Sequence, residues 1–161
     1  MAKKKRGLKP HSEEQQKQYE REARLQWGPS AVNDSIQRWN NTSKERQDAI
    51  IAEGDQIYSE LAEALEAGAR AGDQKVVALL DRWRDHLSHF YEPSIDYLRG
   101  LGQLYNSHPG FIANFQNIHR DLPAYLEEVI DAYVDDLETA ELERMLAEDE
   151  EMQQRRDNLS L

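Results

Sequence analysis

Apolar residues recur every three or four positions along most of the chain, a spacing that is typical of amphipathic helices. The clearest stripe consists of Val76, Val77, Leu80, Trp83, Leu87 and Phe90. No segment alternates apolar and polar residues with β-branched enrichment over more than a few positions, so the pattern does not indicate strands. It predicts an all-α fold.

Helix-capping residues predict where the first elements begin and end. The capping box Ser12-Glu13-Glu14-Gln15 opens a helix that Gly28-Pro29 ends, and Ser30 caps a short second helix that runs to about Asn40. A better box at residues 42–45 opens a long helix that stops at Gly68.

Two further helices follow the turn at residues 68–72. Asp73 caps the first of them and Pro93 ends it, and Ser94 caps the second, which runs through Tyr105. Gly100 and Gly102 lie inside this second helix at a propensity cost of about 1 kcal/mol each, which indicates a close approach of another element.

A short helix and a long terminal helix complete the expected order. The short helix carries Phe111 and Phe115, and Asp121 opens the last helix, whose apolar stripe is continuous only as far as Val134. Beyond it the apolar positions thin to Leu137, Leu142, Met145 and Leu146. We expect residues 135–161 to form an acidic helical extension that projects from the core and frays before Leu161.

The net charge of −11 is unevenly distributed along the chain. Residues 1–9 hold five Lys or Arg and no acid, whereas residues 127–151 hold 12 acidic residues and one basic residue, Arg144. Such an acidic surface repels phosphate backbones, so we expect no nucleic acid to bind the folded body. Residues 1–11 are interpreted as a disordered basic tail.

Composition limits the chemistry and the cellular location that we expect for the protein. The chain has no cysteine, which excludes disulfides, thiolate metal sites and a cysteine nucleophile. Its apolar runs are far shorter than the ~20 residues that cross a bilayer, and no signal-peptide pattern follows the basic start. We therefore expect a cytoplasmic protein that has no membrane partner.

Aromatic residues gather in one part of the sequence. Nine of the 13 lie between residues 83 and 133, namely Trp83, Phe90, Tyr91, Tyr97, Tyr105, Phe111, Phe115, Tyr125 and Tyr133. Helical spacing makes core packing the simpler interpretation for Trp83, Phe90 and Phe115. Several tyrosines in one region nevertheless favour a partly hydrated aromatic cleft, because each buried hydroxyl needs a partner.

The sequence offers no positive case for catalysis. His86 and His89 lie near Asp85 and Glu92, but no third ligand recurs at metal spacing, so we expect no metal and no cofactor. Phosphate-binding glycine loops and hydrolase motifs are also missing from the sequence. We expect a protein that is not an enzyme.

Several blocks of the sequence resemble the TipAS antibiotic-recognition domain, the effector-binding part of MerR-type activators that respond to thiopeptides. They are Phe90-Tyr91-Glu92, residues 99–105 (RGLGQLY), Pro109-Gly110-Phe111 and residues 122–126 (LPAYL). The stretch from Tyr19 to Gly28 resembles the opening helix of the family. The resemblance covers about residues 19–134.

The resemblance implies a globin-like all-α domain over residues 12–134, whose cleft captures bulky aromatic antibiotics. The ligand-binding residues expected on that basis are Trp83, His86, Phe90, Tyr91, Tyr97, Leu101, Tyr105, Phe111 and Phe115. It also implies that residues 12–41 form a mobile lid, to which Trp27 and Trp39 contribute.

This chain departs from the family pattern in ways that bear on its function. Residues 1–18 are too few for a winged helix, so we expect no direct control of transcription. Pro93 stands where thiopeptide-binding relatives carry a cysteine, which excludes covalent capture. Gln47 replaces a frequent Trp and Leu98 a frequent His, so the ligand need not be a thiopeptide.

We therefore expect a protein that sequesters a bulky aromatic or heterocyclic antibiotic, thiopeptide-like or albicidin-like, without altering it. The alternative is a regulatory or interaction protein that responds to a small ligand and acts through a protein partner, with the acidic C-terminal helix as the docking element.

Overall fold

The computed structural model describes residues 29–160, and every regular element in that part of the chain is a helix. The elements are α2 (Pro29–Asn40), α3 (Lys44–Glu66), α4 (Gln74–Leu87), α5 (Ile95–Tyr105), α6 (Pro109–Gln116) and α7 (Leu122–Leu159). The prediction of an all-α fold is confirmed. The basic tail, the helix expected after Ser12 and the lid residue Trp27 lie outside the described residues.

The capping signals place most helix starts correctly. The Ser43 hydroxyl accepts a hydrogen bond from the Arg46 N–H, and the Ser94 hydroxyl accepts one from the Tyr97 N–H, both at 3.2 Å. At α4 the outcome is different, because the Asp73 carboxylate accepts from the Arg70 N–H at 2.8 Å and makes no cap bond to the helix.

One boundary differs clearly from the sequence pattern. The stripe from Val76 to Phe90 and the break at Pro93 predict one helix up to that proline, but α4 ends at Leu87. The backbone then closes tight turns in which the N–H groups of Phe90 and Tyr91 both donate to the Leu87 carbonyl. Because α4 ends at Leu87, Phe90 and Tyr91 lie beyond the helix and do not continue its apolar stripe.

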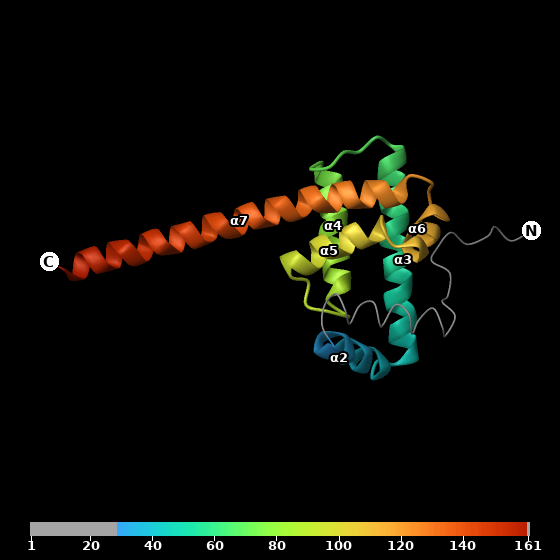
Figure 1. The fold of residues 1–161 in the computed structure, drawn as a ribbon, viewed down its shortest axis with the longest axis horizontal. Helices are drawn as coiled ribbons and strands as arrows, with labels where there is room; N and C mark the ends of the chain where they lie inside the picture. The colour runs from blue at the N-terminus through green and yellow to red at the C-terminus, as the bar shows by residue number, and fades with distance from the viewer. Residues whose placement is uncertain (1–28, 161) are drawn as a thin grey trace, which may run out of the picture.

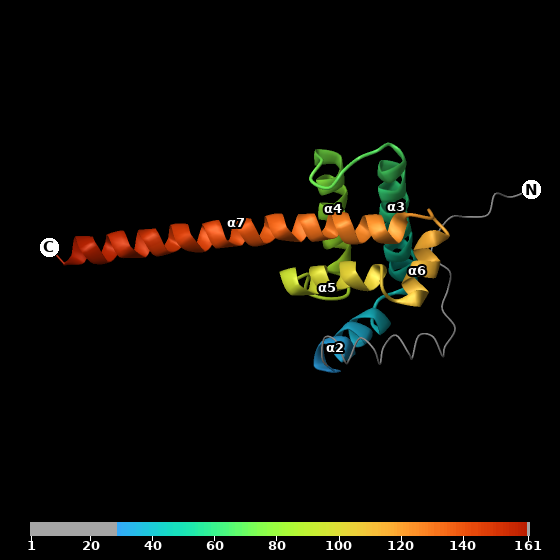
Figure 2. The same cartoon turned by 45° about the horizontal axis from the view of Figure 1, so that its top comes forward.

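Two antiparallel helix pairs cross each other to form the body of the protein. Helices α3 and α4 run side by side, and the pair formed by α5 and the first half of α7 crosses them, with α6 at one end (Figures 1 and 2). Helix α2 lies on the side of the body away from α7 in both views. The finer expectation of a globin-like arrangement stays a prediction.

The α5–α7 contact explains one of the two interior glycines of α5. A Cβ atom at Gly102 would lie 2.8 Å from Cγ2 of Ile130, a distance that packed atoms do not tolerate. Gly102 therefore lets α5 approach α7 closely, as the sequence predicts. Each fully buried aliphatic side chain in this crossing, such as Leu98 or Ile130, contributes about 1.5–3 kcal/mol.

Polar side chains tie the first half of α7 to its neighbours. The Tyr133 hydroxyl donates to Asp81 at 2.6 Å, and the Tyr125 hydroxyl donates to the Ala69 carbonyl at 3.0 Å. On the outer side, the Arg99 guanidinium of α5 pairs with three carboxylates of α7, at 2.5 Å (Asp131), 2.9 Å (Asp135) and 3.1 Å (Glu138). Part of the acidic stretch is thus neutralised by the body itself.

The second half of α7 leaves the body. All its side chains from Thr139 to Ser160 are exposed, and the helix projects as a single rod (Figure 1). The expected acidic projection is thus observed, although the helix stays regular to Leu159 and does not fray earlier. Within residues 29–160 no helix combines the length and apolar character needed to span a membrane.

Candidate functional site

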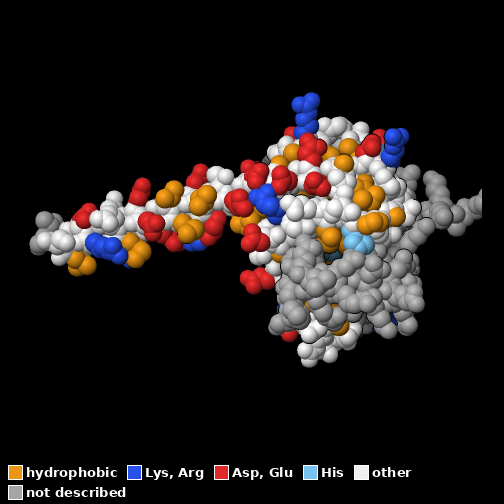
Figure 3. Space-filling model, in the orientation of Figure 1, with side chains coloured by type: hydrophobic (Ala, Val, Ile, Leu, Met, Phe, Trp, Pro, Cys, Tyr) orange, Lys and Arg blue, Asp and Glu red, His pale blue; other side chains and the backbone are white. Residues whose placement is uncertain are grey.

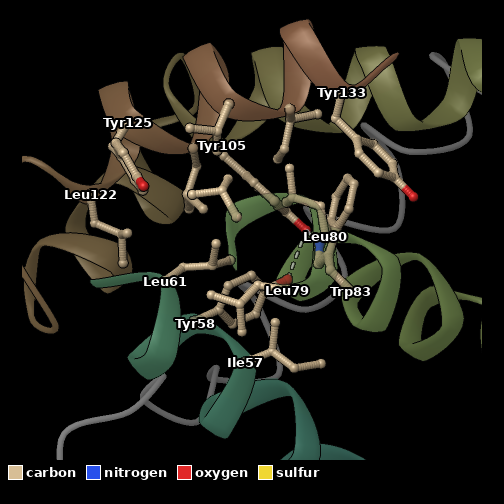
Figure 4. Close-up of a cluster of buried hydrophobic side chains, with 14 of the residues drawn as sticks. Ile57, Tyr58, Leu61, Leu79, Leu80, Trp83, Tyr105, Leu122, Tyr125 and Tyr133 are labelled. Carbon is tan, nitrogen blue, oxygen red and sulfur yellow. Dashed lines mark hydrogen bonds between the residues drawn. The ribbon is translucent and has the colours of Figure 1, made fainter. Parts of the chain in front are cut away.

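Four buried aromatic side chains meet where α3, α4, α5 and α6 converge. We call Tyr58, Trp83, Tyr105 and Phe115 the inner cluster (Figure 4 labels the first three). Their rings meet mostly edge to face, with centroids 4.8 Å apart for Tyr105 and Phe115 and 4.9 Å apart for Tyr58 and Phe115. This is the preferred geometry of aromatic pairs in a packed interior.

Hydrogen bonds satisfy the polar atoms of the inner cluster from within. The hydroxyls of Tyr58 and Tyr105 are 2.9 Å apart, and the Trp83 indole N–H donates to the Tyr105 oxygen at 3.4 Å (Figure 4). Burial raises the pKa of both tyrosine hydroxyls, so they stay neutral at ordinary pH. The tyrosine hydroxyls therefore need no water here, and the partly hydrated environment expected for Tyr105 is replaced by a dry network.

A second set of aromatic side chains lies further out. Trp39, Phe90, Tyr91 and Phe111 are each half-buried, and we call them the outer group. Trp39 packs on Phe90 with ring centroids 5.3 Å apart, Tyr91 on Tyr97 at 5.1 Å, and Phe111 on the inner Tyr105 at 5.5 Å. Phe90, Tyr91 and Phe111 are thus the expected ligand-binding residues that lie at the edge of the core rather than inside it.

The expected lid residue Trp39 is held against the body by a few specific contacts. The Gln47 amide of α3 donates to the Trp39 carbonyl at 2.8 Å, and the Arg38 guanidinium reaches the Ser88 carbonyl at 3.4 Å. Among the described side chains of α2, Val32 and Ser35 alone are buried. Helix α2 is therefore joined to the body through few described contacts, and Gln47 is one of its attachment points.

His86 brings a polar atom into the aromatic region. The residue is 6% exposed, its ring lies 5.6 Å from that of Phe90, and its buried Nδ1 has no hydrogen-bond partner among the described residues. The nearest carboxylate oxygen, on Glu53, is 3.9 Å from Nδ1, too far for a hydrogen bond. Burial lowers the pKa of the ring despite this carboxylate, so His86 is neutral at pH 7.

The nine expected ligand-binding residues thus divide by depth. Trp83, Tyr97, Leu101, Tyr105 and Phe115 are buried in the core, together with His86, whereas Phe90, Tyr91 and Phe111 are half-buried. A direct role of the deeper residues in binding stays a prediction that would require the core to open. Within residues 29–160, no group of three His, Asp or Glu side chains could hold a metal ion.

Two surface hollows in the described part of the chain lie elsewhere. One, of about 240 Å³, is lined by Arg99, Gln103, Glu127 and Asp131, and the other, of about 670 Å³, lies beside Glu66, Ile118 and His119. Neither is lined by an expected ligand-binding residue. The smaller hollow has charged walls, which suit an apolar ligand poorly, whereas the larger one combines Glu63 and Glu66 with Ala62, Ala67 and Ile118.

Two residues that shape this region are missing from the sequence-based prediction of the site. Tyr58 completes the inner cluster, and Gly54 lets α4 approach α3, because a Cβ there would lie 2.8 Å from Nε2 of His86. A glycine in the middle of a 23-residue helix was the available signal for a close contact. Nothing in the sequence identified His86 as the side chain that fills the space.

Comparison with known protein families gives a match over most of the chain. The sequence model of the TipAS antibiotic-recognition domain matches residues 19–133. The chain therefore belongs to the TipAS antibiotic-recognition domain family, a class of domains named for ligand recognition.

A curated relative carries a similar segment within a longer protein. The HTH-type transcriptional activator mta of Bacillus subtilis (strain 168) is 30% identical over 124 residues, which is 76% of this chain and 48% of that protein. The chain thus spans about half the length of this relative. No solved structure matches the chain.

Proposed function

We propose that this protein binds a bulky aromatic or heterocyclic antibiotic non-covalently on the face formed by the outer group, and sequesters it without chemical change. The observation that carries the proposal is the half-buried set of rings on α2, α6 and the segment after α4. These rings lie outside the inner cluster, whose polar atoms already pair with one another. Membership of a family named for antibiotic recognition supports the same conclusion.

Aromatic stacking and burial are sufficient for sequestration. Stiff ligands with several heterocycles lose little conformational freedom on binding, and each aromatic contact adds about 0.5–1.5 kcal/mol beyond the area buried. His86 provides a polar atom beside the ring of Phe90, and a small-molecule site usually combines apolar walls with a few such polar groups. We propose that the chain is not an enzyme and protects by lowering the concentration of free drug.

Helix α2 is proposed to act as part of the lid. Its few attachments, through Trp39, Arg38 and Gln47, allow it to adjust around a ligand that packs beside Phe90. Amide hydrogen exchange tests this proposal. Amides of α2 should exchange faster than those of α4 in the free protein and become strongly protected with ligand. Equal protection of the two helices in the free protein would favour a rigid, preformed site.

The decisive experiment is a tryptophan-fluorescence titration with thiopeptides, albicidin-like oligoarylamides and other stiff aromatic antibiotics. We expect saturable quenching with one of these classes, and mass spectrometry should recover the ligand unaltered. Phe90→Ala should weaken binding, whereas Leu142→Ala, on the projecting helix, should leave it unchanged. Absence of binding to every class would reject the proposal, and an altered ligand mass would reveal an enzyme.

A regulatory role is the second candidate. The relative from Bacillus subtilis is named a transcriptional activator, and α7 exposes apolar residues that no other described helix covers. On this proposal, occupancy of the aromatic site changes how the chain engages a protein partner. It is distinguished from simple sequestration by a partner affinity that changes when the drug binds.

A further inference from the structure

A buried imidazole and an exposed carboxylate lie close together beside the outer group. His86 on α4 is 6% exposed, and its Nδ1 is 3.9 Å from a carboxylate oxygen of Glu53 on α3. The other oxygen of this carboxylate is 4.0 Å from Nε2 of His89. Both distances are too long for a hydrogen bond, and Nδ1 of His86 has no partner among the described residues. A buried polar atom without a partner is rare in folded proteins and calls for an explanation.

The packing around His86 fixes the position of its ring. A Cβ atom at Gly54 would lie 2.8 Å from Nε2, so a larger residue on α3 would displace the imidazole. On another side the ring meets Phe90 edge to face, with the centroids 5.6 Å apart, and Phe90 packs in turn on Trp39. The imidazole therefore contacts both α3 and the outer group.

The charge state of His86 decides what its Nδ1 offers to a partner. Burial lowers the pKa of the ring more than Glu53 raises it, so the ring is neutral at pH 7 and carries one proton. A carboxylate 3.9 Å away favours the tautomer with this proton on Nδ1, because an N–H group is attracted to a nearby negative charge. His86 then offers a donor and Glu53 an acceptor, which are too far apart to bond directly.

A single oxygen atom fits between this donor and this acceptor. An atom about 2.8 Å from both, which is a normal hydrogen-bond length, would see them roughly 90° apart. A hydroxyl group satisfies both partners, because its oxygen accepts from Nδ1–H while its own hydrogen is donated to the carboxylate. An ether oxygen only accepts and an ammonium group only donates, so neither satisfies both.

The surroundings of the pair favour an aromatic carrier for this hydroxyl. The side chain of Glu53 is 46% exposed, so the position between the two groups lies next to the protein surface. Phe90 and Trp39 are half-buried beside it and provide apolar ring surface. A phenolic hydroxyl is also a stronger donor to a carboxylate than a neutral hydrogen bond would be.

We propose that His86 and Glu53 form a hydroxyl-recognition site, which selects ligands that carry a phenolic or hydroxy-heteroaromatic group. The inference rests on the proposed function, since it takes the face of the outer group as the binding site, and it adds the chemical group by which a ligand is chosen. The ligand ring packs on Phe90, its hydroxyl accepts from His86, and the same hydroxyl donates to Glu53. Gly54 is a positioning residue, because its missing Cβ leaves room for the imidazole.

Three quinolines that differ in one substituent test the proposal. At that substituent 6-hydroxyquinoline both accepts and donates a hydrogen bond, 6-methoxyquinoline only accepts, and 6-methylquinoline does neither. Isothermal titration calorimetry should show that the chain binds the hydroxy compound at least about fivefold more tightly than either analogue. Equal affinities for the three compounds, or binding of none of them, would overturn the hydroxyl-recognition site.

Substitutions of the two partners assign the preference to them. His86→Leu and Glu53→Ala should each reduce the preference for the hydroxy compound to less than about twofold, because one of its hydrogen bonds is lost. Gly54→Ala keeps both groups but displaces the imidazole, and should have the same effect. Glu60→Ala is the matched control for Glu53→Ala, since Glu60 lies on the same helix and pairs with Arg82 at 2.7 Å. Circular dichroism checks the fold of each variant, and a preference that survives in both His86→Leu and Glu53→Ala would overturn the proposal.

Exposed apolar side chains on the projecting half of α7 are the alternative place for a flat compound to adsorb (Figure 3). Leu142→Ala removes one of them and should change each affinity by less than about twofold. Loss of the hydroxyl preference in this variant would move the site to α7 and overturn the inference. Titration with the antibiotics keeps the two proposals separate. Antibiotic binding without a hydroxyl preference would refute only the hydroxyl-recognition site, and a hydroxyl preference without binding of any antibiotic would refute only sequestration.

Discussion

The inner cluster and the outer group are built from the same residue types, but they are suited to different tasks. Tyr58, Trp83 and Tyr105 satisfy one another's polar atoms and leave at most 6% of any side chain exposed. Phe90 and Tyr91 lie only a few residues beyond α4, yet both side chains are partly exposed. Aromatic enrichment therefore does not by itself mark a binding site, and depth together with hydrogen bonding separates structure from recognition.

The largest expected effect comes from breaking the inner cluster. Trp83→Ala should lower the free energy of unfolding by about 3–5 kcal/mol, because it leaves a cavity in a fully packed interior. Phe90→Ala is the matched control and should cost about 1 kcal/mol, since Phe90 is only half-buried. Urea denaturation measures both. Similar losses in the two variants would remove the distinction between the two sets of rings.

Removing one oxygen atom probes the network inside the inner cluster. Tyr105→Phe should cost about 1–3 kcal/mol, since it leaves the Trp83 N–H and the Tyr58 hydroxyl without their shared partner. Tyr58→Phe removes one bond only and should cost less. Thermal denaturation of the two single variants and of the double variant gives the coupling energy between the two hydroxyls in a double-mutant cycle. A coupling energy of zero would mean that the hydroxyls do not stabilise each other.

Substitutions in the outer group should change drug affinity more than they change folding stability. We expect Phe90→Ala or Tyr91→Ala to weaken drug binding by about 1–3 kcal/mol. Isothermal titration calorimetry measures the affinity, and the circular dichroism spectrum checks the fold. Unchanged affinity in both variants would place the ligand elsewhere on the protein.

The smallest effect is a pH dependence that originates at His86. Its folded-state pKa lies below the ordinary value of 6.5, so the unfolded chain takes up the proton first. The stability contributed by neutral His86 is present above about pH 6.5 and declines as pH falls below it. The Glu53 carboxylate raises the pKa of His86 and so lessens this decline, whereas the neighbouring His89 lowers that pKa and so adds to it.

Urea denaturation between pH 5 and pH 8 should therefore show a stability loss toward acid that is smaller in His86→Leu. The comparison with this variant separates His86 from the many carboxylates of the chain. An identical pH profile in the two proteins would mean that the buried ring does not contribute to the acid sensitivity.

The sequence allowed the local features of the fold to be predicted. Ser43 and Ser94 cap helices where expected, and Gly102 marks a close helix contact, because these signals depend on neighbours within a few residues or on the missing Cβ itself. The Tyr58–Tyr105 hydrogen bond could not be predicted, since it joins α3 to α5 only after the helix pairs cross. Likewise, the end of α4 at Leu87 is set by tight turns that hydrophobic spacing does not reveal.

The continuous helix α7 also has a mechanical consequence. Its first half is clamped to α5 through Gly102, Ile130 and the Arg99 ion pairs, and its second half is an unsupported lever arm. A tilt of about 10° at the clamp would displace the Leu159 end by about 6 Å, given a free length of ~33 Å. Helix α5 also carries Tyr105 of the inner cluster, so the same helix joins the aromatic core to the base of the lever arm.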